Sequence, residues 1–173
     1  MDDLSALIEA CIRHDRIAQR TLYDRYKKAM FSLAYRMTGD FDMAHDVLQE
    51  AFIEMFRHLN DFRQEASLGR WLKTIIIRKA YRYIEKGKLW IAEVPEELVS
   101  DTGYAQIEAA HLEKAILSLP DGCRAIFLMI EVEGYSHREV SELLDISEGT
   151  SKSQLHAAKR KLRELLKSPA LIS

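Results

Sequence analysis

Residues 134–167, GYSHREVSELLDISEGTSKSQLHAAKRKLRELLK, predict two helices separated by a short turn, and this stretch decides the fold. The first helix is expected over about 136–144. Ser136 stands at its N-cap position with Glu139 three residues later, the pattern of a capping box. Residues 145–147 form the turn, and the second helix is expected to begin near 148–150. The stretch therefore predicts a helix-turn-helix.

Each of the two helices has an apolar face at helical spacing. In the first helix and the turn these positions are Val140, Leu143, Leu144 and Ile146, and in the second they are Leu155, Ala158, Leu162, Leu165 and Leu166. The other face of the second helix carries Lys152, Ser153, His156, Ala157, Arg160 and Arg163.

The second helix is also strongly basic. From Gly149 to Arg163 it contains no acidic residue but five basic ones: Lys152, Lys159, Arg160, Lys161 and Arg163. A recognition helix in a major groove needs donors near its start for base edges and cations for phosphates. An amphipathic helix with a solvated basic face is the alternative. The preceding helix and turn favour DNA binding.

Composition places the chain among ordinary helical proteins. Its 173 residues suffice for one or two small domains, and 7 Gly and 3 Pro are few. No apolar run approaches the roughly 20 residues of a membrane span. The beginning, MDDL, lacks a signal-peptide pattern, and Cys11 and Cys123 are isolated. We therefore expect a cytoplasmic protein without membrane insertion.

Charge is segregated along the chain although the formal net charge is only −2. The stretch 70–88 carries seven basic residues and one acidic residue, whereas 91–113 carries six acidic residues and no Lys or Arg. Two basic regions thus flank an acidic connector, a pattern that suggests two nucleic-acid contacts in one chain.

Periodicity predicts an all-α fold of two small helical domains. The expected helices are 4–14, 17–37, 42–59 and 68–86, followed by 106–118, 121–133, 136–144 and 149–167. We place the N-terminal domain at 1–86, an acidic linker at 87–105 and the C-terminal helix-turn-helix domain at 106–173.

The predicted helix 42–59 has a broad apolar stripe for the core: Ala44, Val47, Leu48, Ala51, Phe52, Met55, Phe56 and Leu59. Its reverse face holds Ile53 among polar residues: Asp46, Gln49, Glu50 and Arg57. An aliphatic side chain ringed by polar groups suggests a protein-binding site. Isolated exposed aliphatics are common, however, and the pattern alone favours that simpler interpretation.

The predicted helix 68–86 mixes aromatic residues with cations. Trp71, Tyr81 and Tyr83, with Trp90 beyond the helix, interleave with the basic residues, a composition that suits unstacked bases of melted DNA. The alternative places Trp71 and Tyr83 in the core, and for Trp71 the core position is favoured.

Three segments together resemble one family. DVLQEAF at 46–52, FRQEASLGRWL at 62–72, and the set LP at 119–120, GYSHREV at 134–140 and GTSKS at 149–153 occur in that order. They resemble sigma-70 family sigma factors of the extracytoplasmic-function (ECF) group, and the resemblance covers nearly the whole chain. It implies binding to core RNA polymerase, through its β′ clamp helices and β flap, and to promoter DNA. It also suggests that the acidic linker threads the active-site cleft, and that an anti-sigma factor often holds such proteins inactive.

The resemblance, combined with the patterns above, assigns residues to three surfaces. Binding of core polymerase is assigned to Asp46, Gln49, Glu50 and Ile53. The resemblance therefore favours a partner contact for Ile53 over an isolated exposed aliphatic residue. The −10 element is assigned to Arg63, Arg70, Lys73, Arg78, Lys79, Arg82 and Lys86. The −35 element is assigned to Lys152, Ser153, Gln154, His156 and Arg160. The chain departs from the family pattern at Arg78, Arg82, Gln154 and Ala157, and these departures bear on base preference.

Two other functions remain as alternatives. One is a stand-alone helix-turn-helix regulator with an N-terminal dimerisation or sensor domain, against which the motif near Asp46 and the basic aromatic helix argue. The other is a metal enzyme using His45, Glu50, Glu54 and His58, whose spacings lack a Glu-x-x-His pair. We expect no enzymatic activity, no metal and no cofactor.

Overall fold

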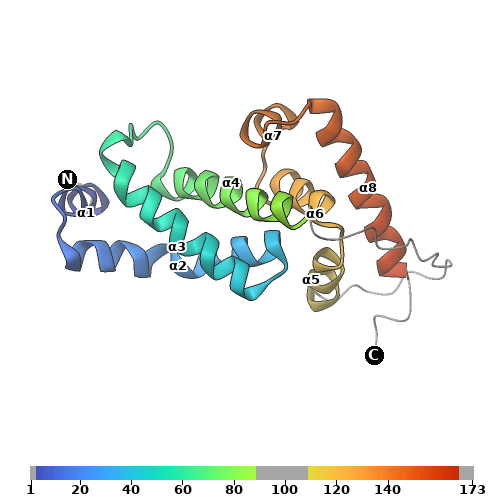
Figure 1. Ribbon diagram of the computed structural model, residues 1–173, viewed down its shortest axis with the longest axis horizontal. Helices are drawn as coiled ribbons and strands as arrows, with labels where there is room; N and C mark the ends of the chain where they lie inside the picture. Colours follow the sequence, from blue (N-terminus) through green and yellow to red (C-terminus); the bar gives the residue numbers. More distant parts are fainter. Residues whose placement is uncertain (1–2, 89–108, 168–173) are drawn as a thin grey trace. The chain divides into compact units, whose positions relative to one another are not determined.

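A computed structural model describes residues 3–88 and 109–167, and within these ranges every regular element is helical (Figure 1). The chain forms two compact units, Met1–Tyr83 and Ile84–Ser173, with the boundary inside α4. The predicted all-α fold class is confirmed. Of the predicted acidic linker 87–105, residues 87 and 88 belong to α4, and the rest lies outside the described residues. The domain limits at 86 and 106 stay a prediction.

The elements follow the predicted helices closely. Up to α4 they are α1 (Asp3–Ile12), α2 (Arg16–Thr38), α3 (Phe41–His58), η1 (Leu59–Asp61) and α4 (Leu68–Lys88). After the undescribed segment come α5 (Ala109–Leu117), α6 (Asp121–Phe127), η2 (Leu128–Val132), α7 (His137–Leu144) and α8 (Glu148–Lys167).

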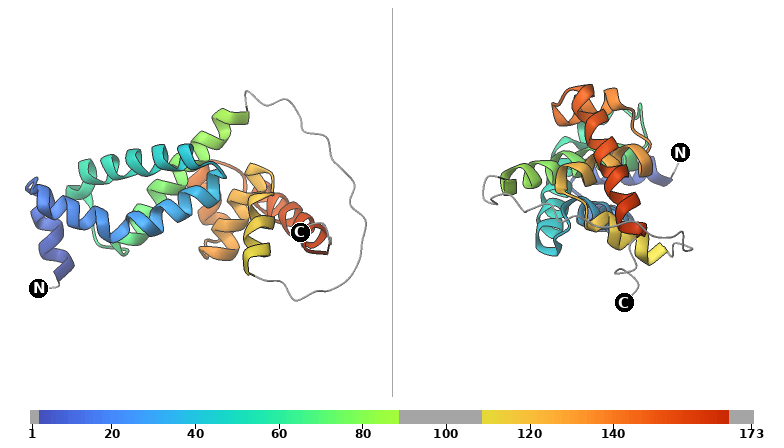
Figure 2. Two further views of the ribbon diagram at one scale, coloured as in Figure 1. Left: turned by 90° about the horizontal axis from the view of Figure 1, so that it is seen from below. Right: turned by 90° about the vertical axis from the view of Figure 1, so that its right-hand side faces the viewer.

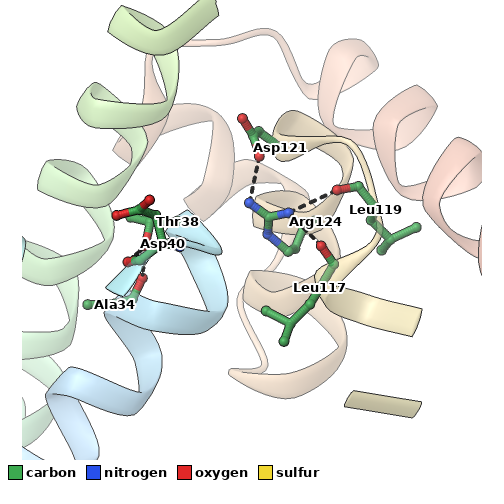
Figure 3. Close-up of polar contacts among 7 residues, drawn as sticks. All are labelled: Ala34, Thr38, Asp40, Leu117, Leu119, Asp121 and Arg124. Carbon is green, nitrogen blue, oxygen red and sulfur yellow. Dashed lines mark hydrogen bonds and ion pairs between the residues drawn. The ribbon is translucent and has the colours of Figure 1, made fainter. Parts of the chain in front are cut away.

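Helices α2 and α3 form a tight antiparallel hairpin (Figure 2). Gly39 ends α2 in the left-handed conformation at φ 68°, which glycine adopts without a Cβ penalty. Asp40 then caps α3 by accepting a hydrogen bond from the Met43 amide at 2.8 Å. Thr38 also fixes this turn, because its hydroxyl donates to the Ala34 carbonyl of α2 at 2.9 Å and accepts from the Asp40 amide at 3.4 Å (Figure 3).

The predicted core stripe of α3 is buried. Ala44, Val47, Ala51 and Met55 are fully inaccessible, and only Phe56 of the predicted set is half-buried. Large buried side chains of the other helices in this unit complete the core: Leu22, Met30, Met37, Leu72, Ile76 and Ile77. One face of α3 is therefore held against the core, which leaves the opposite face to solvent.

The helix-turn-helix has the predicted local structure. Ser136 accepts from the Glu139 amide at 3.1 Å while the Glu139 carboxylate accepts from the Ser136 amide at 2.8 Å, so the capping box is confirmed. Asp145 turns the chain after α7 with φ 55°, a conformation that Asp tolerates better than most residues. Ser147 caps α8 by accepting from the Thr150 amide at 2.9 Å.

The helix predicted over 121–133 differs from expectation in its second half. It is α-helical only to Phe127 and continues as a π-helical turn, η2, in which the Glu133 amide reaches the Leu128 carbonyl. Leu128 and Met129 are buried by this wider turn. Hydrophobic spacing does not reveal such a bulge, because a single inserted residue shifts the apolar face only locally.

A buried arginine fixes the turn between α5 and α6 (Figure 3). Arg124 is 3% exposed and donates to the carbonyls of Leu117 at 3.2 Å and Leu119 at 2.9 Å. Its guanidinium also pairs with Asp121 at 2.6 Å. The fork of guanidinium donors thus satisfies the carbonyl of Leu117, the last residue of α5, and the carbonyl of Leu119 in the turn that follows.

Candidate nucleic-acid and protein interfaces

The exposed face of α3 carries the residues predicted to bind a protein partner. Asp46, Gln49, Glu50 and Ile53 are spaced three, four and seven residues apart, which places them on one helix face. All four are exposed, and Ile53 is 51% exposed. We name these four residues the α3 stripe. An aliphatic centre with a polar surround is the general composition of a protein interface.

Aromatic side chains extend this surface on the α2 side, a feature that sequence reasoning missed. The rings of Phe31 and Phe41 lie 5.4 Å apart, and the His45 ring lies 4.7 Å from Phe31 and 4.6 Å from Phe41. Phe41 is 59% exposed. The spacing of Phe41 and His45, four residues apart at the start of α3, was the available signal.

On its other side, α3 is joined to α4 by charged and polar contacts. The Tyr83 hydroxyl donates to the Glu50 carboxylate at 2.5 Å. The Lys79 ammonium lies 2.7 Å from the Glu54 carboxylate and 3.8 Å from that of Glu50. The hydrogen bond to Glu50 raises the pKa of Tyr83 to about 12, and the hydrogen bond from Lys79 lowers the pKa of Glu54.

The cations assigned to the −10 element differ in exposure. Arg63, Arg70, Arg78, Arg82 and Lys86 are exposed, and Lys73 is half-buried. The side chain of Lys79 is only 13% exposed, because it is held between the two α3 carboxylates. The sequence grouped Lys79 with the other six, but the structure separates it from them.

A hollow opens between the loop before α4 and the first turns of α4. It encloses about 290 Å³, and its lining includes Phe62, Arg63, Arg70, Trp71 and Thr74. The Phe62 and Trp71 rings stack with centroids 5.1 Å apart. The core position favoured for Trp71 is wrong, because Trp71 is half-buried and lines this hollow. Aromatic faces beside guanidinium groups can receive an unstacked base.

Helix α8 presents to solvent most of the residues that the sequence predicts to bind DNA. Lys152, Ser153, His156 and Arg160 are exposed. Gln154 is half-buried and accepts a hydrogen bond from the Cys123 thiol of α6 at 2.9 Å. Glutamine pairs most naturally with adenine through two hydrogen bonds, and for Gln154 such a contact competes with the bond from the thiol.

Two further contacts orient α8 within its unit. The Ser151 side chain is buried and lies 2.8 Å from the His137 ring of α7. The Lys159 ammonium pairs with Glu131 of η2 at 2.6 Å. Lys159 therefore contributes to positioning α8 within its unit.

Comparison with known proteins supports a single family. Residues 22–89 match Sigma-70 region 2, and residues 110–162 match Sigma-70, region 4. ECF RNA polymerase sigma factor SigL of Mycobacterium tuberculosis is 32% identical over 152 residues, covering 83% of this chain and 86% of SigL. SigW of Bacillus subtilis is 26% identical over 170 residues, covering 88% of this chain and 91% of SigW.

A solved structure shows the same fold. The sigma factor RpoE, in complex with the anti-sigma factor NepR from Bartonella quintana, superposes with a TM-score of 0.56 at 21% identity. The superposition covers 87% of this chain and 97% of RpoE.

The two helical units, the helix-turn-helix and the matched regions define a promoter-recognition protein of bacterial transcription. The chain belongs to the ECF group of the sigma-70 family of RNA polymerase sigma factors. A sigma factor binds core RNA polymerase and directs it to promoters for initiation, and a stand-alone regulator is not favoured by these matches.

Among the residues that the structure describes, no helix combines the length and the apolar character needed to cross a bilayer. In the same residues, no three His, Cys, Asp or Glu side chains gather in a group that could hold a metal ion. The four residues of the metal-enzyme alternative make other contacts: His45 with aromatic rings, Glu50 and Glu54 with α4, and His58 with Asp61.

Proposed function

We propose that the α3 stripe is the main contact of this sigma factor with core polymerase. The observation that carries the proposal is the exposure of Ile53, with Asp46, Gln49 and Glu50 around it, on a helix whose opposite face is buried. The protein acts through the polymerase: catalysis belongs to the polymerase, no cofactor is needed, and the site of action is the cytoplasm, where that partner works.

The −10 element is assigned to the hollow before α4 and to the exposed cations of α4. Promoter opening requires bases that leave the stack to be captured, and aromatic faces and cations bind such bases without a paired strand. The hollow offers Trp71 beside Arg63 and Arg70. Arg78 and Lys86 lie farther along α4 and are exposed.

Replacing Arg78 with Asn is expected to shift the preferred −10 bases. The resemblance to the family pattern implies Asn at the position of Arg78, and a guanidinium can read a guanine edge that an amide reads poorly. Lys86→Ala is the matched control and is expected to lower affinity without changing the preferred sequence. Run-off transcription across a randomised −10 pool measures both. An unchanged consensus with Arg78→Asn would make Arg78 a solvated cation.

The −35 element is assigned to Lys152, Ser153, Gln154, His156 and Arg160 of α8. Four of these residues are exposed near the start or along the outer face of the helix. For Gln154 we propose that the amide exchanges the Cys123 thiol for adenine on binding. A thiol is a weak donor, so the exchange gives up a weak hydrogen bond for two stronger ones.

Gln154→Ala and Arg160→Ala are expected to change DNA binding in different ways, the first at one base pair and the second at all sequences. Gln154→Ala should cost about 1–3 kcal/mol on the preferred site and relax selectivity at one base pair. Arg160→Ala should weaken binding to all sequences alike. It should also lower by about one the slope of log affinity against log salt concentration (the salt slope), because it removes a single phosphate contact. Binding measured over a −35 library at several salt concentrations separates the two effects, and equal changes in specificity would contradict the division of roles.

The overall function is tested by run-off transcription. Core polymerase with the purified chain should initiate at a defined subset of a genomic fragment library, whereas the chain alone should select no promoter. Promoter selection by the chain without polymerase would instead indicate a stand-alone regulator.

We also propose that an anti-sigma factor regulates this chain, since the relative of the same fold was solved with one. A chromosomally tagged chain should then co-purify with an anti-sigma protein before induction.

A further inference from the structure

Two contacts between α3 and α4 form parallel rungs. Glu50 and Glu54 are four residues apart on α3, and Tyr83 and Lys79 are four residues apart on α4. Residues at this spacing lie on one face, one turn apart. Tyr83 bonds to Glu50 at 2.5 Å and Lys79 to Glu54 at 2.7 Å. Two rungs one turn apart restrict both the sliding and the rotation of α4 on α3.

The positive charge of Lys79 is already neutralised by two carboxylates of α3, those of Glu50 and Glu54. Its ammonium has carboxylates at 2.7 and 3.8 Å, and 13% of its side chain is exposed. A contact between Lys79 and a DNA phosphate would break a charge-assisted hydrogen bond and leave Glu54 facing the phosphate. Arg78, Arg82 and Lys86 on the same helix are exposed, so their charged ends are accessible in a way that the Lys79 ammonium is not.

Both rungs are intact at neutral pH. The Tyr83 phenol is protonated at neutral pH and can donate to Glu50, and that hydrogen bond raises the pKa of Tyr83 further, to about 12. The Glu54 carboxylate is ionised at neutral pH, and the hydrogen bond from Lys79 lowers its pKa further. Hydrogen bonds with an ionised partner are the stronger kind, which suits a contact that must hold one helix in register on another.

We propose that Lys79 and Tyr83 are positioning residues that fix the register of the promoter-facing helix α4 on the polymerase-facing helix α3, and that Lys79 does not contact DNA. Neighbouring residues are separated by about 100° around a helix axis. Fixing positions 79 and 83 against α3 therefore sets the direction in which Arg78 and Arg82 project. The inference rests on the proposed function of α3 and α4.

The test uses holoenzyme reconstituted from core polymerase and the full chain, on a promoter obtained by run-off selection. Lys79→Met should lower open-complex formation about tenfold, a change that corresponds to a free energy within the range of coupling between contacting residues. The salt slope should stay unchanged. Lys86→Ala, the matched phosphate-contact control, should lower the salt slope by about one. A salt slope that falls equally with Lys79→Met would overturn the proposal.

A charge exchange separates positioning from DNA contact. Lys79→Glu should impair open-complex formation, and adding Glu54→Lys should recover a large part of it, although Glu50 beside position 79 prevents full recovery. If Lys79 bound phosphate, the double variant would stay as impaired as Lys79→Glu, because a carboxylate would still face the DNA. That result would overturn the inference.

Two further measurements keep the result interpretable. Tyr83→Phe preserves the ring and should lower open-complex formation with unchanged core binding and salt slope; normal open-complex formation would contradict the role of Tyr83. The charge exchange is also followed as the thermal midpoint of the free chain, which should fall with Lys79→Glu and recover with the double variant. Failure of the proposed function of α3 and α4 would give a different result. Lys86→Ala and Arg78→Asn would then leave promoter binding unchanged, but the thermal midpoint would still recover in the Lys79→Glu, Glu54→Lys variant.

Discussion

Asp46→Arg combined with Ile53→Glu is expected to abolish co-purification of the chain with core RNA polymerase. The change reverses one charge of the α3 stripe and places a carboxylate at its apolar centre. Interface energy is concentrated in a few central residues, and burying an unpaired charge there costs several kcal/mol. Because both side chains are exposed, the fold should lose little stability.

The control for this experiment is Ile17→Glu. Ile17 is an exposed aliphatic residue of α2, 80% accessible, so its replacement introduces the same carboxylate elsewhere on the same unit. Ile17→Glu should retain polymerase, and helical content measured by circular dichroism should be equal in all variants. Undiminished polymerase binding by the Asp46→Arg, Ile53→Glu variant would exclude the α3 stripe as the interface.

The sequence was sufficient to predict the features that depend on residues close together in the chain. The Ser136–Glu139 capping box, the Asp145 turn and the core stripe of α3 each depend on residues within a few positions of one another. The exposed position of Ile53 follows from the same periodicity, since a helix with one buried face must present the other. Fold class and the polar face of α3 were therefore predictable.

Contacts between distant residues were not predictable in the same way. Lys79 and Lys86 look alike in the sequence, but the carboxylates of Glu50 and Glu54, 29 and 25 positions before Lys79, remove the Lys79 cation from the exposed set. Gln154 meets Cys123, which is 31 residues away. Trp71 stacks on the ring of Phe62, nine residues before it, instead of lying in the core. Periodicity gives the direction of a side chain on its own helix but does not identify the neighbour that it meets there.

Arg124→Met is expected to destabilise the unit that contains α5 to α8 by about 3 kcal/mol. Methionine fills the buried space but leaves the Leu119 carbonyl without the guanidinium donor that it has now. Hydrogen bonds to charged groups contribute roughly 1.5–3 kcal/mol each, and an unsatisfied buried acceptor costs about 1–3 kcal/mol. Asp121 loses less, because its side chain is 42% exposed and can be solvated.

Thermal unfolding of the full chain measures this effect. The transition of the C-terminal unit should move to lower temperature with Arg124→Met, and −35-dependent transcription should fall with it, whereas co-purification with core polymerase through α3 should persist. Arg124→Lys is the matched control: it keeps the charge but cannot reach both carbonyls and Asp121 with a rigid fork, so its effect should be intermediate. Arg124→Met with an unchanged unfolding transition would show that other contacts hold the turn between α5 and α6.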